Sequence, residues 1–299
     1  KLESDGIKVF PSSKTLKIIQ DKNLQKKFFT ENKIPTAKFW HFKSLQDYNS
    51  SSVKNEIKFP CVWKKTKFGY DGFGVEIINC SNDLEKLPES EFIIEELIPF
   101  KKEIATTIAR NKSGQIEVFP IVEMMFNKIS NQVEYVICPA QINDDVKAKA
   151  KEIALNVSKS FKQIGLLAVE MFLTNDNKVL VNEVAPRPHN SAHYSIEACT
   201  NSQFEQHIKS ILDLPLGCSK SNIYAIMVNL VGEKGFSGPV VYSGIEEAMQ
   251  YDNVSVHLYG KSETKPNRKM GHATILDTSL KNGLSRAKSI KKIIKIKTS

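Results

Sequence analysis

The sequence predicts an α+β protein built mainly from antiparallel sheets. Short apolar runs rich in β-branched and aromatic residues follow one another between glycine and proline turns, as in FPCVWKK at 59–65. Helical spacing is confined to three longer segments, and residues 166–183 have the pattern of a strand hairpin. The length of 299 residues is enough for two or three compact units.

Three segments are predicted to be helices. Residues 13–33 carry apolar side chains at helical spacing behind a serine cap. A second helix begins at the cap Asn143, has two acidic residues in its first turn, and is expected to end at Gly165. The third helix occupies residues 202–217, which finish in proline and glycine.

The predicted strands are short and separated by turn residues. They lie at residues 59–65, 75–80, 91–98, 102–110, 117–125, 166–174 and 178–183. Residues 224–276 add further short strands between glycine-rich turns.

Composition excludes several protein classes. The net charge of +9 is uneven, because residues 285–299 hold six basic groups and no acid. We expect this tail to be a frayed, solvated helix and do not expect nucleic acid as a partner. The five cysteines are scattered without a CxxC pair, which indicates reduced thiols, and neither a membrane span nor a signal peptide is recognised. A cytoplasmic protein is therefore expected.

The hairpin at 166–183 predicts a pair of facing carboxylates. If Asp176 and Asn177 form a two-residue turn, position 174 faces 179, 172 faces 181, and Glu170 faces Glu183. Two carboxylates opposite each other on one face of a sheet repel and need a positive charge between them. Mg²⁺ is one candidate, and an ion pair with Arg187 or a lysine is the alternative.

A glycine-rich segment, KKTKFGYDGFG at 64–74, lies between two predicted strands. Its glycines allow backbone N–H groups to approach phosphate oxygens, and its lysines supply positive charge. It matches neither a Walker loop nor a dinucleotide fingerprint. The segment is interpreted either as a flap over a polyphosphate or as a plain glycine hairpin.

Two further segments carry polar groups. The strand at 91–98 runs into Glu95 and Glu96, with Glu103 following; backbone groups there could read an adenine edge, and an acid could hold ribose hydroxyls. The string HNSAH at 189–193 has histidines at i and i+4, but Asn190 stands where a zinc metalloprotease carries glutamate. Zinc is not expected there.

Three blocks of sequence together resemble one enzyme family. They are GYDGFG at 69–74, NEVAPRPHNSAHYSIEACTNSQFEQHIKSILDLPLG at 182–217 and YGKSETKPNRKMGH at 259–272. The chain resembles the N5-carboxyaminoimidazole ribonucleotide synthetases, ATP-grasp ligases of purine synthesis, from about residue 8 to residue 276. Related ATP-grasp ligases share the glutamate pair and the flap but not the APRPHNS and RKMGH blocks.

The resemblance implies an ATP-grasp fold, with a small lid, a larger antiparallel-sheet domain and a small β-rich C-terminal domain. Family members usually begin with a Rossmann-like domain, and this chain is expected to start after it. The expected ranges are 1–34 for the linker and first helix, 35–98 for the lid, 99–218 for the main domain and 219–299 for the C-terminal domain with its basic tail.

The resemblance also implies the active-site residues. Mg²⁺ on the phosphates would be held by Glu170 and Glu183. The residues expected at ATP are Lys22, Lys64, Gly69, Tyr70, Asp71, Gly72, Gly74, Glu95, Glu96, Leu97, Ile98, Glu103, Asn182 and Glu183. Those expected at the ribonucleotide are Tyr70, Arg187, His189, Asn190, Ser191, Lys261, Arg268 and Lys269.

The implied reaction joins bicarbonate to an amine at the expense of ATP. Bicarbonate would attack the γ-phosphoryl group to give carboxyphosphate, and the exocyclic amine of 5-aminoimidazole ribonucleotide would take the carboxyl group, without biotin. Arg187, His189 and Asn190 are the expected catalytic residues. The family also implies a homodimer and a functional link to N5-carboxyaminoimidazole ribonucleotide mutase.

Two departures and three alternatives stay open. Lys22 stands where the family often has arginine, and Phe126 stands where it has a nucleotide-side histidine. The alternatives are a formate-dependent glycinamide ribonucleotide transformylase, a biotin carboxylase and a non-catalytic basic binding protein.

Overall fold

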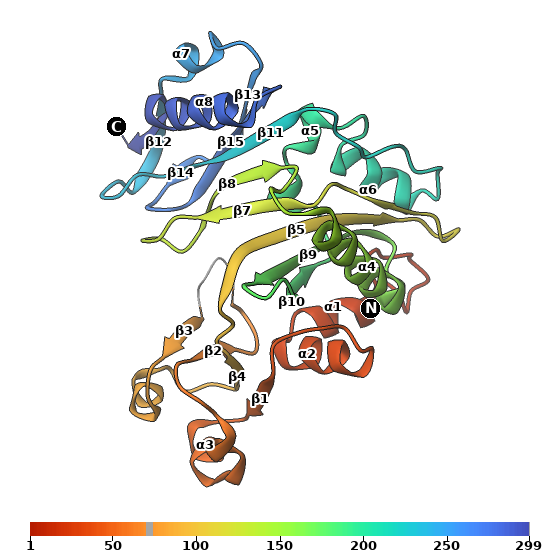
Figure 1. Ribbon diagram of the computed structural model, residues 1–299, viewed down its shortest axis with the longest axis vertical. Helices are drawn as coiled ribbons and strands as arrows, with labels where there is room; N and C mark the ends of the chain where they lie inside the picture. Colours follow the sequence, from red (N-terminus) through yellow and green to blue (C-terminus); the bar gives the residue numbers. More distant parts are fainter. Residues whose placement is uncertain (70–73, 299) are drawn as a thin grey trace.

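The computed structural model describes residues 1–69 and 74–298. Figure 1 shows a small sheet with its helices at one end, a long sheet through the middle, and a helix-covered β unit at the other end. Within the described residues there are a four-stranded, a nine-stranded and a three-stranded sheet. The α+β prediction with antiparallel sheets is confirmed, because every pairing between named strands is antiparallel.

The N-terminal segment forms two helices, α1 (Ser13–Ile19) and α2 (Lys22–Glu31). The single helix predicted over 13–33 is wrong. Asp21 has an extended backbone, and its carboxylate accepts a hydrogen bond from the Leu24 N–H at 3.1 Å. An aspartate cap of this kind starts a new helix and ends the old one.

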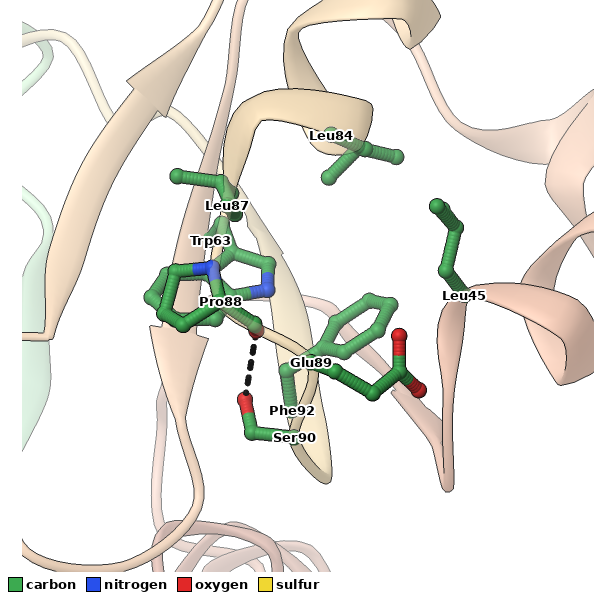
Figure 2. Close-up of a pocket in the computed structure, with 8 residues that line it drawn as sticks. All are labelled: Leu45, Trp63, Leu84, Leu87, Pro88, Glu89, Ser90 and Phe92. Carbon is green, nitrogen blue, oxygen red and sulfur yellow. Dashed lines mark hydrogen bonds between the residues drawn. The ribbon is translucent and has the colours of Figure 1, made fainter.

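The four-stranded sheet has the order β1-β4-β2-β3. Its elements are β1 (Phe39–Phe42), α3 (Leu45–Ser50), η1 (Ser52–Glu56), β2 (Cys61–Lys65), β3 (Val75–Ile78), η2 (Ser81–Lys86) and β4 (Phe92–Glu96). Aromatic side chains dominate its core, with Trp63 and Phe92 each at most 3% exposed. A cavity of about 10 Å³ lies beside them, and at its edge Ser90 Oγ donates to the Pro88 carbonyl at 3.2 Å. Figure 2 shows the side chains that line it. The cavity has room for about one water, too little for a ligand.

The nine-stranded sheet is the largest of the three sheets within the described residues. Its order is β10-β9-β5-β7-β8-β11-β15-β13, and β6 pairs with β5. The strands are β5 (Phe100–Arg110), β6 (Ile116–Val118), β7 (Val122–Phe126), β8 (Val133–Cys138), β9 (Gly165–Thr174), β10 (Val179–Ala185), β11 (Tyr224–Val231), β13 (Val254–Leu258) and β15 (Lys269–Asp277).

Helix α4 (Asp144–Phe161) packs an apolar face on this sheet and begins at the predicted cap, Asn143. It ends earlier than predicted. Lys162 adopts the left-handed conformation with φ 51° and stops the helix, whereas Gly165 opens β9. The residue at the true end of the helix is a lysine, so a prediction based on glycine as the terminating residue placed the end too late.

The remaining elements pack against the nine-stranded sheet at several places or form the three-stranded sheet beside it. They are η3 (Asn190–Ala192), α5 (Ser195–Ala198), α6 (Gln203–Ile211), β12 (Gly238–Ser243), α7 (Ile245–Met249), β14 (Glu263–Thr264), α8 (Leu280–Ile293) and β16 (Lys295–Thr298). Strand β11 pairs with β8, so one sheet crosses the expected boundary at 218/219. The four domain ranges stay predictions.

The basic tail is folded, and the expectation of a frayed, solvated helix is wrong. Ile290, Ile294 and Ile296 are at most 4% exposed in a core that α8 and β16 share with β11 and β15. Lys295 pairs with Glu233 at 3.1 Å, which removes part of the free charge. The alternating isoleucines supply enough apolar area to dock the segment despite its lysines. In the part of the chain that the structure describes, no helix has the length and apolarity to cross a membrane.

Candidate active site

The β9–β10 hairpin brings the two predicted carboxylates together by a route that the sequence did not predict. The turn has three residues, 175–177, with Asn177 left-handed at φ 64°, so Val179 faces Leu173 and Val181 faces Met171. The predicted two-residue turn is therefore wrong by one position. A bulge between Val181 and Glu183 shifts the register back. Glu183 faces Glu170, as predicted.

A third carboxylate lies on the same face of the sheet. On β5, Ala105 faces Glu170, and Glu103 is two residues further along on the same side. Burial raises the pKa of Glu103 to about 7, and the negative charge of Glu170 adds to the shift. Glu103, Glu170 and Glu183 therefore form one patch of hard oxygen ligands on three neighbouring strands.

Lysine side chains face this patch from the N-terminal helices and the small sheet. Lys22 Nζ lies 2.8 Å from Glu183 Oε2, and its charge is the main reason why the pKa of Glu183 falls to about 2. Lys64 Nζ lies 3.0 Å from both Asn182 Oδ1 and Glu95 Oε2. Of the ion pairs that the sequence left open, the structure contains the lysine one, while Arg187 donates to the Pro188 carbonyl at 3.0 Å.

Lys26 completes this group, and sequence analysis missed it. Its Nζ lies 3.2 Å from Glu95 Oε1 and donates to Thr36 Oγ1 at 2.7 Å, although the side chain is only 3% exposed. Thr36 in turn donates to the Val181 carbonyl at 2.8 Å. We call Lys22, Lys26 and Lys64 the lysine cluster. The Glu95 carboxylate is buried between two of these lysines, so its side chain is already paired within the protein.

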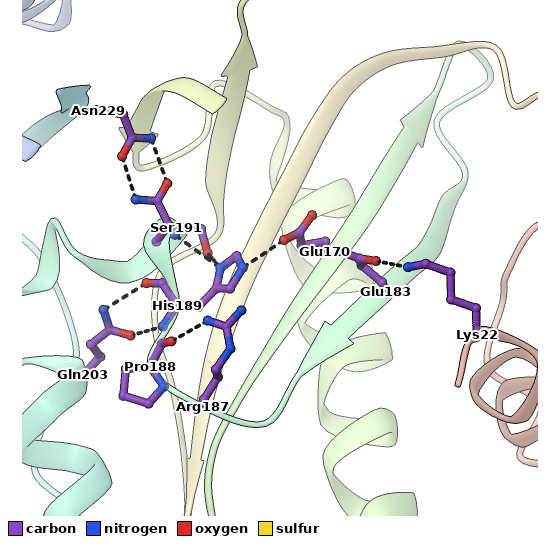
Figure 3. A network of polar contacts seen from close by, with 10 residues as sticks. Lys22, Glu170, Glu183, Arg187, Pro188, His189, Ser191, Gln203 and Asn229 are labelled. Carbon is purple, nitrogen blue, oxygen red and sulfur yellow. Dashed lines mark hydrogen bonds and ion pairs between the residues drawn. The ribbon is translucent and has the colours of Figure 1, made fainter. Parts of the chain in front are cut away.

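The loop after β10, residues 186–193, lies on the other side of Glu170. Figure 3 shows the His189 ring between the carboxylate and Ser191. His189 Nε2 is 3.0 Å from Glu170 Oε1, and Nδ1 is 2.9 Å from Ser191 Oγ and accepts from the Ser191 N–H at 3.3 Å. An accepting Nδ1 places the proton of a neutral ring on Nε2, where it points at Glu170.

Two buried amides hold this loop, and neither was predicted. Asn190 and Asn229 exchange hydrogen bonds through their side chains at 2.7 and 2.8 Å, and Asn229 also donates to the Val133 carbonyl at 2.8 Å. Gln203 contacts both backbone groups of His189. Their partners lie far away in the sequence, so no local pattern could have identified them.

Three histidines stack behind the loop. His193 and His257 lie 4.7 and 4.6 Å from the ring of His272, both nearly parallel to it. Burial lowers the pKa of His193 to about 4 and that of His272 to about 3, so both are neutral near pH 7. His257 pairs with Glu197 at 2.5 Å. Among the described residues no three His, Cys, Asp or Glu side chains form a ready metal site.

The C-terminal block contributes the cations expected at the ribonucleotide. Lys261 Nζ donates to the Lys269 carbonyl at 2.5 Å, and Arg268 Nη1 donates to the Glu263 carbonyl at 2.8 Å. Positive charge on Lys269 and Arg187 contributes, after burial, to the low pKa of His193, so both lie within electrostatic range of that ring. Convergence of Lys261, Arg268 and Lys269 on one anion stays a prediction.

The other expected residues lie at the junction of the two larger sheets or outside the described chain. Leu97 and Ile98 join β4 to β5, and Gly74 adopts φ 76° while its carbonyl accepts from the Lys65 N–H at 2.9 Å. Tyr70, Asp71 and Gly72 lie outside the described residues. Gly69 follows β2, Glu96 ends β4, Phe126 ends β7 and Ser191 lies in η3.

Comparisons with known proteins agree with this arrangement. The family model of the ATP-grasp domain matches residues 27–204, and that of the phosphoribosylaminoimidazole carboxylase C-terminal domain matches residues 225–286. The N5-carboxyaminoimidazole ribonucleotide synthase of Synechocystis is 32% identical, over 96% of this chain and 74% of the relative.

Solved structures give the same result. The crystal structure of N5-carboxyaminoimidazole ribonucleotide synthetase from Thermotoga maritima superposes with a TM-score of 0.89 at 43% identity, covering 100% of this chain and 78% of that one. That of the Aspergillus clavatus N5-carboxyaminoimidazole synthase, in complex with ADP and 5-aminoimidazole ribonucleotide, has a TM-score of 0.86 at 28% identity, covering 97% and 77%. The chain spans about half the length of the first curated relatives that it matches, such as the phosphoribosylaminoimidazole carboxylase of Saccharomyces cerevisiae, of which it covers 49%.

Proposed function

The chain belongs to the N5-carboxyaminoimidazole ribonucleotide synthase family of ATP-grasp proteins, and we propose that it carboxylates 5-aminoimidazole ribonucleotide with ATP and bicarbonate. One observation carries the proposal. Glu170 faces Glu183 on one side and the Nε2 of His189 on the other, at 3.0 Å. The pair of carboxylates thus joins the lysine cluster, which contacts Glu183 and is suited to phosphates, to the loop, which contacts Glu170 and is suited to a carboxylated anion and its acceptor.

The residues present fit a magnesium ion shared with ATP. Glu170 and Glu183 offer hard oxygen ligands on one face, beside a third carboxylate that burial and repulsion leave easily protonated. Mg²⁺ bound there would neutralise phosphate charge. It would need ligands from the nucleotide as well, because no group of three metal-binding side chains is preformed among the described residues.

The chain's own groups would then position the reactants. Lys64 and Lys22 lie where they can turn from Asn182, Glu95 and Glu183 to phosphate oxygens. Bicarbonate oxygen attacks the γ-phosphorus, ADP leaves, and the carboxyphosphate formed transfers its carboxyl group to the exocyclic amine with release of phosphate and a proton. His189 and Arg187 would hold the carboxylate that is transferred, and Asn190 would face the acceptor.

The remaining expectations are part of the same proposal. The proposed location is the cytoplasm, and the proposed partners are a second copy of the chain and the N5-carboxyaminoimidazole ribonucleotide mutase. Nucleic acid is not among the proposed partners, since Arg286 and Lys295 of the tail are already paired with acidic residues within the fold.

ADP release with defined co-substrates tests the function. We expect release only when aminoimidazole ribonucleotide and bicarbonate are both present. Release that requires formate and glycinamide ribonucleotide, or biotin, would instead assign the chain to another ATP-grasp reaction. Retention of nucleic acid without any ATP binding would identify a non-catalytic basic protein.

A further inference from the structure

Two of the eight residues in the loop at 186–193 lack a backbone donor that could hold the loop in place. Pro186 and Pro188 have no N–H group. The Ala192 N–H donates to the His189 carbonyl at 3.0 Å, which closes only the short turn of η3. Anything that fixes His189 relative to the sheet must therefore come from outside the loop.

Gln203, the first residue of α6, supplies that support. Its Oε1 accepts from the His189 N–H at 2.8 Å, and its Nε2 donates to the His189 carbonyl at 3.0 Å. The same Nε2 lies 2.9 Å from His193 Nδ1. The orientation of the amide is fixed, because the His189 N–H can only donate and its carbonyl can only accept.

Gln203 is itself rigidly placed. Its side chain is fully buried, and its backbone N–H donates to Ser195 Oγ at 2.9 Å. Ser202 caps α6 and exchanges hydrogen bonds with Glu205 in a capping box. The peptide group of His189 is thus tied to the start of a capped helix, as Figure 3 shows for the two bonds to Gln203.

We propose that Gln203 is a positioning residue that holds the His189 imidazole at its working distance from Glu170. The inference rests on the proposed function for its catalytic meaning. A displacement of about 1 Å at a reacting group costs on the order of 100-fold in rate, and an unsupported His189 peptide would allow one. Gln203 therefore acts on the reaction through His189, without touching the substrates.

A matched control three residues along α6 separates positioning from plain stability. Gln206 is also fully buried, and its amide holds another loop by accepting from the Gly217 N–H at 3.2 Å and donating to Ser219 Oγ at 2.9 Å. That loop lies outside the candidate active site. Gln203→Met and Gln206→Met each remove one buried amide clamp of the same size, so their thermal stabilities should fall together.

Two measurements on these variants test the proposal. In steady-state kinetics we expect Gln203→Met to lower kcat/KM for aminoimidazole ribonucleotide roughly 30- to 100-fold with the ATP KM unchanged, and Gln206→Met to leave both within about twofold. In histidine ¹H–¹⁵N spectra, we expect His189 to show the Nε2–H tautomer in the wild type and Gln206→Met, and averaged tautomers in Gln203→Met.

Each outcome decides the question. Equal kinetic losses in the two variants, or a His189 signal unchanged by Gln203→Met, would overturn the positioning role. Absence of aminoimidazole-dependent ADP release in the wild type would refute the proposed function instead, and the tautomer spectra would still show whether Gln203 orients His189.

Discussion

The lysine cluster and the loop at 186–193 lie on the two flanks of the β9–β10 hairpin, and different kinds of interaction hold them in place. The lysine cluster is held by charge, with the buried Glu95 and the partly exposed Glu183 as counter-ions. The loop at 186–193 is held by neutral groups, above all the amides of Gln203 and Asn229 and histidines whose low pKa keeps them uncharged. Buried charges can exchange partners when a phosphate arrives, whereas neutral hydrogen bonds give a fixed geometry. The difference indicates that the lysine cluster rearranges when a ligand binds, whereas the geometry of the loop at 186–193 is already formed without one.

The largest effect is expected where the flanks meet. Glu183→Gln removes a proposed metal ligand and the partner of Lys22, so Mg²⁺-dependent turnover should fall by roughly 100-fold or more while the fold stays intact. Turnover as a function of magnesium concentration, with circular dichroism as the fold control, is the measurement. Near-normal activity at ordinary magnesium would refute the metal assignment, and a loss of stability alone would indicate a purely ionic role.

A smaller effect is expected at the C-terminal block. Arg268→Ala should raise the KM for aminoimidazole ribonucleotide and cost about 2 kcal/mol in kcat/KM, because a guanidinium can bind a phosphate with two hydrogen bonds. Arg268→Lys should restore little, since an ammonium cannot make the paired contact. Steady-state kinetics for both substrates checks this. If the ATP constant rises instead, Arg268 belongs to the nucleotide side and the division into two flanks is wrong.

A substitution at Lys26 tests whether the three lysines of the cluster act together on nucleotide binding. Lys26→Met removes one of the two cations on Glu95 and should raise the ATP KM by about 5- to 10-fold, because Glu95 then competes more strongly for Lys64. The KM for aminoimidazole ribonucleotide should not change. Lys27→Met, on the exposed side of the same helix, is the matched control. Equal nucleotide affinity in the two variants, measured by calorimetry with ADP, would argue against joint action of the lysine cluster.

The last effect concerns the pH dependence of stability and not the reaction. A histidine whose pKa is lowered in the folded state stays neutral there, while the same histidine in the unfolded chain takes up a proton. The free energy of unfolding therefore falls as the pH drops below about 6.5. It levels off near the folded-state pKa values, about 4 for His193 and about 3 for His272. Glu183, with its pKa lowered to about 2, loses its contribution only below about pH 4.5. His272→Gln should flatten the dependence between pH 6.5 and 4.5 by about 1 kcal/mol per pH unit. Urea unfolding at several pH values measures it, and an unchanged slope would contradict the neutral stack.

The sequence predicted the chemistry of the site better than its supports. Glu170 and Glu183 were identified as a facing pair, yet the argument succeeded because two departures cancelled: a three-residue turn moved the register by one, and a bulge near Asn182 moved it back. A bulge has no clear sequence signature, since it depends on how the strands twist and pack. Lys26 carries no mark in the sequence that separates it from the neighbouring lysines of its helix, and Asn229 lies 39 residues from Asn190. Tertiary contacts of this kind leave no periodic or local trace.

The transfer of oxygen from bicarbonate tests the central claim most directly. If the two flanks act on one reaction through carboxyphosphate, the oxygen that attacks ATP stays on phosphorus when the carboxyl group leaves. The measurement is mass spectrometry of the phosphate released in the presence of ¹⁸O-bicarbonate and aminoimidazole ribonucleotide. Our account predicts one ¹⁸O in each phosphate, formed together with one carboxylated product. Phosphate without label, with the product still formed, would contradict it.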